Sequence, residues 1–186
     1  MEEMYDKPQH VKDTFNENNL TEYLLQAQWA ELIELKKAIT ELYQKKGSPL
    51  RVLDIGIGDA RILKHLVGIK EIWNAIEHYE GIDIAQNCIN LSQKVIADLD
   101  IGDKSNVQLL DATKLDSLNQ KYDLIISTWF TIGTFYPSNF DLEKFKPGLD
   151  LSTNDKIITI IKQAYGMLKP KTTMIMSVRV MLCSRM

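Results

Sequence analysis

Apolar side chains recur along most of this sequence with two different spacings. Short runs of consecutive apolar residues alternate with stretches in which apolar residues recur every three or four positions, and Gly or Pro stands at most of the changes. Runs of the first kind are typical of buried strands, and stretches of the second kind are typical of amphipathic helices. Strands are predicted at residues 51–55, in a segment that ends at 81–83, and at 107–110, 122–127 and 173–182.

The first helical stretch precedes the first strand. It is expected to begin at a capping box formed by Asn19 and Glu22 and to end before Gly47 and Pro49. Its predicted inner face consists of Leu25, Trp29, Leu32, Ile33, Ile39 and Leu42.

Three further helices are expected between the strands. One runs from Ala60 to Val67, and a less regular stretch at 69–80, with room for a helical turn, follows it. The predicted inner face of the next helix holds Cys88, Leu91, Val95 and Leu99. That of the last helix holds Ile157, Ile161, Ala164, Tyr165 and Leu168. Strands that alternate with helices favour a parallel sheet with right-handed crossovers and helices on both faces.

The turn after the first strand, Asp54-Ile55-Gly56-Ile57-Gly58-Asp59-Ala60-Arg61, carries the most informative residues. Gly56 and Gly58 allow a sharp turn and a close approach of the backbone to a ligand. Two cofactor families use such a turn, and a tight turn without a ligand is a third interpretation. A dinucleotide site needs a third glycine for close packing of helix and strand, and Arg61 stands at that position.

The pattern D-x-G-x-G-x-[GA]-R instead resembles the first motif of the class I S-adenosylmethionine (SAM)-dependent methyltransferases, with Ala60 where glycine is frequent. The resemblance covers about residues 50–182. It implies an α/β fold with a Rossmann-like, doubly wound, mostly parallel sheet of strand order 3-2-1-4-5. Residues 1–48 are then an N-terminal segment and helix that cap the cofactor, and residues 49–186 are the SAM-binding core.

The same resemblance implies a set of cofactor-binding residues. Asp54 is expected near the methionine part of SAM, Asp83 at the ribose hydroxyls and Asp111 at the adenine. The remaining members of the expected cofactor site are Gly56, Gly58, Asp59, Arg61, Ile84, Ala112, Ser127 and Thr128. Other roles stay open for the two carboxylates, since Asp83 also suits an NAD site or a helix N-terminus, and Asp111 also suits a helix cap.

An aromatic-rich segment follows the fourth strand. Trp129, Phe130 and Tyr136 are candidates for a substrate pocket, and packing of these rings on the core is the alternative. No catalytic residue is assigned, and His10 is the histidine to test as a general base. Asp123 lies at the far end of its strand from the ligand and is expected to be structural.

Composition narrows the function classes. The net charge of -3 and the pI near 5.7 give no electrostatic footprint for nucleic acid. Two cysteines provide neither a disulfide framework nor a metal site, and the sequence holds no apolar run long enough for a membrane span. We expect a cytoplasmic protein with a small-molecule substrate, no metal, and no nucleic acid or membrane partner.

The C-terminal sequence departs from the family that it resembles. That fold has seven strands, and the last two are expected to be missing here, which leaves the edge of the fifth strand open. A truncated chain is therefore expected, or one whose edge is covered by a second copy or a partner chain. The main hypothesis is SAM-dependent methyl transfer; the alternatives are an inactive or SAM-binding remnant and, disfavoured by Arg61, an NAD-dependent oxidoreductase.

Overall fold

The computed structural model of the chain describes residues 9, 13, 16–128 and 152–177. In these residues, five strands form one sheet in which all neighbours run parallel, in the order β3-β2-β1-β4-β5. The strands are β1 (Leu50–Ile55), β2 (Ile76–Asp83), β3 (Ser105–Leu109), β4 (Tyr122–Ser127) and β5 (Leu168–Met176). The predicted fold class and strand order are thus confirmed.

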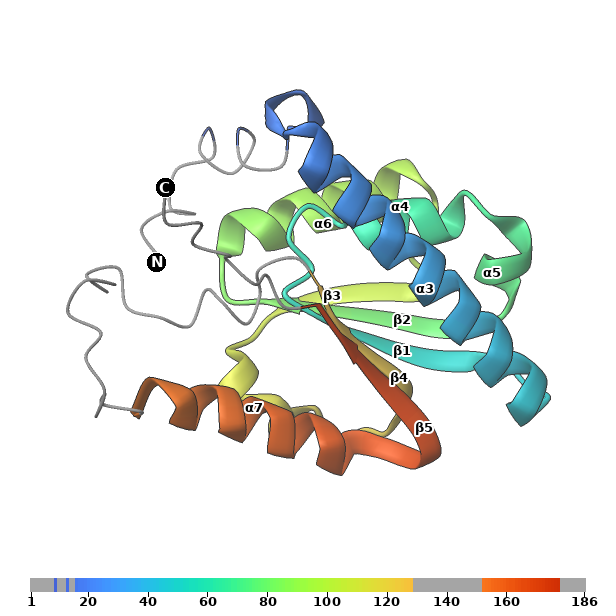
Figure 1. Cartoon of the computed structure of the whole chain (residues 1–186). Coiled ribbons are helices and arrows are strands. Elements are labelled where there is room, and N and C mark those ends of the chain that lie inside the picture. The colour runs from blue at the N-terminus through green and yellow to red at the C-terminus, as the bar shows by residue number, and fades with distance from the viewer. Residues whose placement is uncertain (1–8, 10–12, 14–15, 129–151, 178–186) are drawn as a thin grey trace, which may run out of the picture.

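Helices cover both faces of this sheet (Figure 1). One face carries α3 (Glu22–Lys46), α4 (Arg61–Val67), α5 (Lys70–Asn74) and α6 (Gln86–Asp98). The other face carries α7 (Ser152–Met167) and the 3-10 helix η2 (Ala112–Leu118), and a short 3-10 helix, η1 (Glu17–Asn19), precedes α3. In Figure 1 the blue helix α3 and the orange helix α7 lie on opposite sides of the strands.

Helix α3 begins later than its predicted capping box. Its N-cap is Thr21, whose side chain accepts a hydrogen bond from the Leu24 amide at 3.4 Å, and Glu22 is already the first helical residue. The predicted cap at Asn19 is therefore wrong, because Asn19 belongs to η1 and Thr21 offers its oxygen nearer to the free amides. The predicted end is confirmed: Gly47 has φ 71° and donates to the Tyr43 carbonyl at 2.8 Å.

The inner face of α3 is rotated from the predicted one. Trp29 and Ile33 are both 57% exposed. The buried residues of the helix are Gln28, Leu32, Leu35 and Ile39. Trp29 instead makes an edge-to-face contact with His65 of α4, with ring centroids 5.7 Å apart. Leu32 and Ile39 belong to both the predicted and the observed inner face. Tertiary packing buries Leu35 with them and leaves Trp29 and Ile33 exposed.

Two other helices show smaller rotations. In α6, Cys88 is buried as predicted, but Leu99 is exposed. The other buried residues of this helix are Ile89, Ser92 and Ile96. In α7, Ala164 is buried as predicted, whereas Ile161 and Tyr165 are exposed and Ile160 and Met167 are buried. Leu168, expected on this helix, begins β5. Adjacent apolar residues such as Ile160 and Ile161 fit helical spacing equally well, so the sequence pattern does not choose between them.

Strand ends differ by a few residues from the prediction. The less regular stretch at 69–80 contains α5 and the first half of β2, so its helical turn is confirmed. Strand β3 begins at Ser105, two residues early, and β5 begins at Leu168 and so includes the predicted turn at 169–171. The strand is irregular at the predicted turn, because Lys171 has φ 63° and the pairing of β4 with β5 shifts register nearby. Residues 178–182 lie outside the described part.

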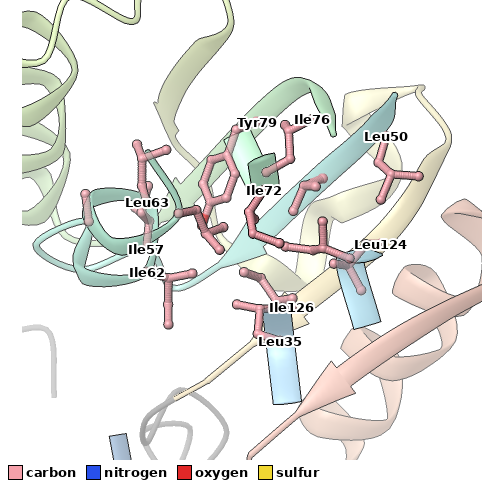
Figure 2. Packing of buried hydrophobic residues seen from close by; sticks show 14 of the residues in the cluster. Leu35, Leu50, Ile57, Ile62, Leu63, Ile72, Ile76, Tyr79, Leu124 and Ile126 are labelled. Carbon is pink, nitrogen blue, oxygen red and sulfur yellow. The ribbon is translucent and has the colours of Figure 1, made fainter. Parts of the chain in front are cut away.

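The core has two parts, one on each face of the sheet. On the first face, Leu50 and Val52 of β1 pack with residues of α3, α4 and α5. Figure 2 shows this cluster at close range, with the ring of Tyr79 lying among aliphatic side chains such as Ile76 and Leu63. On the second face, Leu53 packs under α7. This alternation along β1 buries both faces of the strand and fixes its carboxyl end as the place where the next turn emerges.

Candidate functional site

The turn between β1 and α4 is held by the neighbouring strand β2. The backbone amides of Gly56 and Ile57 both donate to the carbonyl of Ile82, at 2.8 and 3.0 Å. Gly56 has φ 80° and Gly58 has φ 58°, which are conformations that glycine adopts without steric cost. The predicted need for two glycines is therefore explained by the backbone, and the turn is shaped by protein contacts alone.

Ala60 ends this turn in the same left-handed region, with φ 62° and ψ 31°. Its amide donates to the Ile57 carbonyl at 3.0 Å, and its methyl group is fully buried in the core under α4. An L-residue in this conformation is strained by about 1–2 kcal/mol. The sequence departure at this position, alanine for a frequent glycine, thus keeps the glycine-like backbone.

Asp83 links the turn to α6. Its Oδ2 accepts a hydrogen bond from the Gly58 amide at 3.0 Å, and its Oδ1 accepts one from the Ala85 amide at 2.9 Å. Burial raises the pKa of this carboxyl above its ordinary value, although its hydrogen bonds to backbone amides oppose the rise. The Ser92 hydroxyl also donates to the Gly58 carbonyl at 2.8 Å. Hydrogen bonds thereby hold both the backbone amide and the backbone carbonyl of Gly58.

Gly81 allows this turn to approach β2. A Cβ atom on Gly81 would lie 2.3 Å from Cδ1 and 3.1 Å from Cβ of Ile57, and 3.0 Å from Cγ1 of Val107. Such distances require the neighbours to move. A side chain at position 81 would therefore force the side chains of Ile57 and Val107 to shift.

Asp54 lies at the end of β1, with only 2% of its surface exposed. The Tyr79 hydroxyl donates to its Oδ2 at 2.6 Å. Burial raises the pKa of Asp54 to about 7; the hydrogen bond from Tyr79 and the nearby charge of Arg61 oppose the rise, while Asp83 and Glu31 add to it. Asp54 therefore changes its charge near neutral pH.

Charged side chains of both signs surround this carboxyl. Arg61 forms an ion pair with Glu31 of α3 at 2.8 Å, and both side chains are largely buried. Lys64 forms a second pair with Asp59 at 2.7 Å, and Asp59 also accepts from the Arg61 amide at 3.2 Å. The start of α4 is thus tied both to the helix above it and to the turn before it.

Four of the residues just described, Asp54, Asp59, Arg61 and Lys64, border one cavity of about 390 Å³. The predicted cofactor residues that line it are Asp54, Gly56, Gly58, Asp59, Arg61 and Thr128. The other lining residues are Asn16, Asn18, Leu20, Gln28, Ile57, Ile62 and Lys64. Residues that lie far apart in the sequence therefore meet there, with the segment before α3 as one wall.

The remaining predicted cofactor residues, Asp83 among them, do not line this cavity. Ile84 is half exposed, Ser127 is buried at the end of β4, and Ala112 begins η2. Asp111 caps η2, because its carboxylate accepts from the Thr113 amide at 2.8 Å. The capping role that the sequence left open is thus present, and it does not test a ligand role.

Two further sets of candidates have different outcomes. His10, Trp129, Phe130 and Tyr136 fall outside the described residues. Asp123 lies at the opposite end of β4 from the cavity, where its Oδ2 accepts from the amide of Arg51 at 2.8 Å and from the amines of Lys46 at 3.0 Å and Lys169 at 2.9 Å. The expected structural role of Asp123 is confirmed by these contacts.

Within the described ranges, no group of three or more His, Cys, Asp or Glu side chains is arranged to hold a metal ion. Over the same ranges, no helix combines the length and the apolar character that a membrane span needs.

Comparison with known proteins places the fold. No protein-family model matches the sequence, and no curated protein matches it. Solved structures do match. A SAM-dependent methyltransferase from Clostridium acetobutylicum superposes with a TM-score of 0.54 at 16% identity over 92% of this chain, and TehB from Haemophilus influenzae with 0.55 at 15% over 91%. The CcbJ methyltransferase from Streptomyces caelestis gives 0.51 at 19% over 75%. The fold is that of the SAM-dependent methyltransferases.

The three neighbours are longer than this chain, which spans 56%, 44% and 47% of their respective lengths. The shared methyltransferase fold therefore accounts for the sheet and its flanking helices. It does not by itself assign the cavity a ligand.

Sequence reasoning missed the residues that the N-terminal part brings to this cavity in the methyltransferase fold. Gln28 lines it from the buried face of α3, and Glu31 reaches Arg61 from the same helix. One signal was available, because Gln28 precedes Leu32 and Leu35 at helical spacing and is thus a polar residue on an apolar face. No comparable pattern marks Asn16 or Asn18.

Proposed function

We propose that this chain binds SAM and transfers its methyl group to a small-molecule acceptor. The observation that carries the proposal is the cavity at the carboxyl ends of β1 and β4, which joins Asp54, the glycine turn and Thr128. Ligands of open parallel sheets bind at this edge, near the point where strand order reverses. In the order β3-β2-β1-β4-β5 that point lies between β1 and β4.

The cavity suits the methionine part of SAM. A volume of about 390 Å³ is within the usual range for small-molecule pockets. The ammonium group of a bound amino acid would be attracted by Asp54, and its carboxylate by Arg61 and Lys64, which border the same space. A wall with both signs of charge favours a zwitterion over a ligand with one charge.

The nucleoside part of SAM would extend toward β2 and β3. Asp83 is the last residue of β2, and each of its carboxylate oxygens accepts a hydrogen bond from a backbone amide, which leaves further lone pairs for the ribose hydroxyls. Asp111 follows β3, the next strand outward. This succession of acidic side chains supports the proposed ribose and adenine roles.

When bound, SAM supplies the methyl group and the sulfonium leaving group. The contribution of this chain is to hold and shield the reacting groups. The glycine turn is fixed by the Ile82 carbonyl, so its shape does not have to form when the ligand arrives. Leu20 and Gln28 line the cavity from the N-terminal side.

Calorimetric titration with SAM and with S-adenosylhomocysteine tests the proposal. Wild type is expected to bind both compounds. Asp83→Asn is expected to weaken binding at least tenfold, since one charge-assisted hydrogen bond contributes about 1.5–3 kcal/mol. Asn keeps the size of the side chain and one of the two acceptors for the Gly58 and Ala85 amides, whereas Ala would remove both acceptors. The matched control is Asp98→Asn, which removes the same charge from an exposed residue of α6. Absence of binding heat with wild type contradicts the proposal.

The alternative function is SAM binding without turnover. The proposed roles of the residues that line the cavity are cofactor contacts, and none of the described residues is assigned to an acceptor. Incubation of the chain with labelled SAM and a mixture of metabolites separates the two functions. A labelled product supports methyl transfer, and binding without any product supports the alternative.

A further inference from the structure

We propose that Tyr79 is a positioning residue that holds Asp54 in the form that recognises a cation, so that binding of a cationic ligand in the cavity releases a proton from Asp54. This inference rests on the proposed function, because it takes the ammonium group of SAM as the cation. It extends that function by naming a residue behind the cavity that governs how the site responds to pH.

The geometry places the two side chains in different environments. Tyr79 is fully buried and is not among the residues that line the cavity, whereas Asp54 lines it. The register of β1 and β2 pairs Tyr79 with Val52 and Asp54 with Gly81. The phenol ring therefore runs along the face of the sheet and places its hydroxyl 2.6 Å from Oδ2 of Asp54.

The ring of Tyr79 has little freedom to move. Figure 2 shows it among aliphatic side chains that include Leu63, Ile72 and Ile76. Its hydroxyl is thus a fixed donor, and Oδ2 of Asp54 is held toward the sheet. Oδ2 is the oxygen that accepts this hydrogen bond, and Asp54 lines the cavity, so the hydrogen bond sets the orientation of the recognising group.

The charged groups that face Asp54 come from three elements. Arg61 of α4 favours the ionised carboxylate; Asp83 at the end of β2 and Glu31 of α3 disfavour it. Burial is the largest influence and raises the pKa to about 7, while the Tyr79 hydroxyl lowers it by donating to the charged form. A ligand cation acts in the same direction as Arg61. Its arrival favours the ionised form, and the proton passes to solvent.

The first test is the pH dependence of SAM binding to wild type and to Tyr79→Phe. In wild type, affinity is expected to rise between pH 5.5 and 7.5, with proton release detected calorimetrically in buffers of different ionisation enthalpy. The variant lacks the donor that favours ionisation, so its profile is expected to move by about one unit to higher pH, which is about a tenfold loss of affinity at pH 6. A flat wild-type profile, or coincident profiles, overturns the inference.

Tyr122→Phe is the matched control. Tyr122 is also fully buried and also donates to a buried carboxylate, that of Glu80, on the other face of the sheet. The loss of this hydroxyl is expected to leave the pH profile of binding unchanged. An equal shift in both variants would mean that Tyr79 acts only through general stability, and would also overturn the inference.

The second test needs no ligand. The carboxyl carbon of Asp54, observed by NMR in the unliganded protein, is expected to titrate near pH 7 in wild type and at higher pH in Tyr79→Phe. Equal midpoints in the two proteins refute the role of Tyr79. If SAM fails to bind wild type at every pH, the proposed function fails, and this titration still decides separately whether Tyr79 controls Asp54.

Discussion

Two buried tyrosine–carboxylate pairs lie on opposite faces of the sheet and differ in what surrounds them. Tyr79 and Asp54 lie on the face beneath α3 and α4, whereas Tyr122 donates to Glu80 on the face beneath α7. Glu80 also accepts hydrogen bonds from Gln108 at 2.6 Å and from Asn106 at 3.4 Å. Asp54 borders the cavity.

The comparison shows that a chemical pair does not define a role. Glu80 meets side-chain donors from β3 and β4, which satisfy its oxygens within the protein and make it part of the scaffold. Among the described residues, Tyr79 is the side chain that donates to Asp54, and the space beyond the carboxyl belongs to the cavity. A buried carboxyl with few donors at the border of a cavity is suited to a ligand.

The strongest test of this contrast exchanges each carboxyl for an amide. Asp54 has a pKa of about 7 in the folded chain against 3.8 ordinarily, so wild-type stability is expected to fall as the pH rises from about 4 to 7. Asp54→Asn removes this dependence and is expected to raise stability at pH 8 by roughly 1–4 kcal/mol. Glu80→Gln is expected to lower stability by about 1–3 kcal/mol, because its amide nitrogen replaces one of the two oxygens and brings a donor toward either Gln108 or Tyr122, which both donate to this side chain.

Chemical unfolding of the three proteins at pH 5 and pH 8 measures these changes. Opposite signs at pH 8 confirm the contrast. Equal destabilisation by the two substitutions would contradict it, because Asp54 would then be as much a part of the scaffold as Glu80.

Gly81→Ala tests whether the two faces respond separately. The new Cβ would meet Ile57 and Val107 on the face of the cavity, and such overpacking costs about 1–3 kcal/mol. Because Ile57 belongs to the glycine turn, SAM affinity is expected to fall at least tenfold. Calorimetry with the purified variant measures that loss, and full affinity in a destabilised variant would show that the turn is less dependent on β2 than its hydrogen bonds indicate.

Asp123→Asn changes a carboxyl that belongs to neither tyrosine–carboxylate pair. Burial of Asp123 acts to raise its pKa, but the Arg51 amide together with Lys169 and Lys46 holds it below the ordinary value of 3.8. The stabilising effect of the charge is therefore present above that pH and lost as the pH falls below it. We expect a loss of about 1–2 kcal/mol at pH 7. Thermal unfolding at pH 7 and pH 3 checks this, with SAM affinity at pH 7 unchanged.

The smallest effect is expected in the helix above Tyr79. Trp29 is 57% exposed and contacts His65 by its edge, so Trp29→Ala is expected to cost less than about 1 kcal/mol. Leu32→Ala, on the buried face of the same helix, is expected to cost about 2–5 kcal/mol. Denaturant titration of both variants measures the difference. A larger loss of stability for Trp29→Ala than for Leu32→Ala would support the helix face that the sequence pattern predicted.

The sheet was predictable because its signals are local. The apolar runs and the turn residues between them placed all five described strands, and the glycines after the first strand identified the turn that carries the cavity. The inner faces of the helices were harder, since Trp29 and Ile33 fit helical spacing as well as Leu35 does. Which set becomes buried depends on the partner surface, and that information is not local.

The interactions that distinguish the site were beyond sequence reasoning for the same reason. Tyr79 lies in the irregular stretch at 69–80, and its contact with Asp54 follows from the register of two strands. The ion pair of Glu31 with Arg61 joins residues from two helices. The ligand roles of Asp83 and Asp111 stay predictions, as does the division of the chain at residue 48. A partner chain over the edge of β5 also stays a prediction.

Ala60 has a consequence for how such sites are recognised in other sequences. Its left-handed backbone favours glycine, while its methyl group fills a place in the core, so exchange for glycine would relieve strain and open a hole of similar cost. Natural variation between the two residues should therefore be nearly neutral at this position. A search pattern that requires glycine at this position would reject proteins whose backbone follows the same path. A pattern written in backbone dihedral angles would retain them.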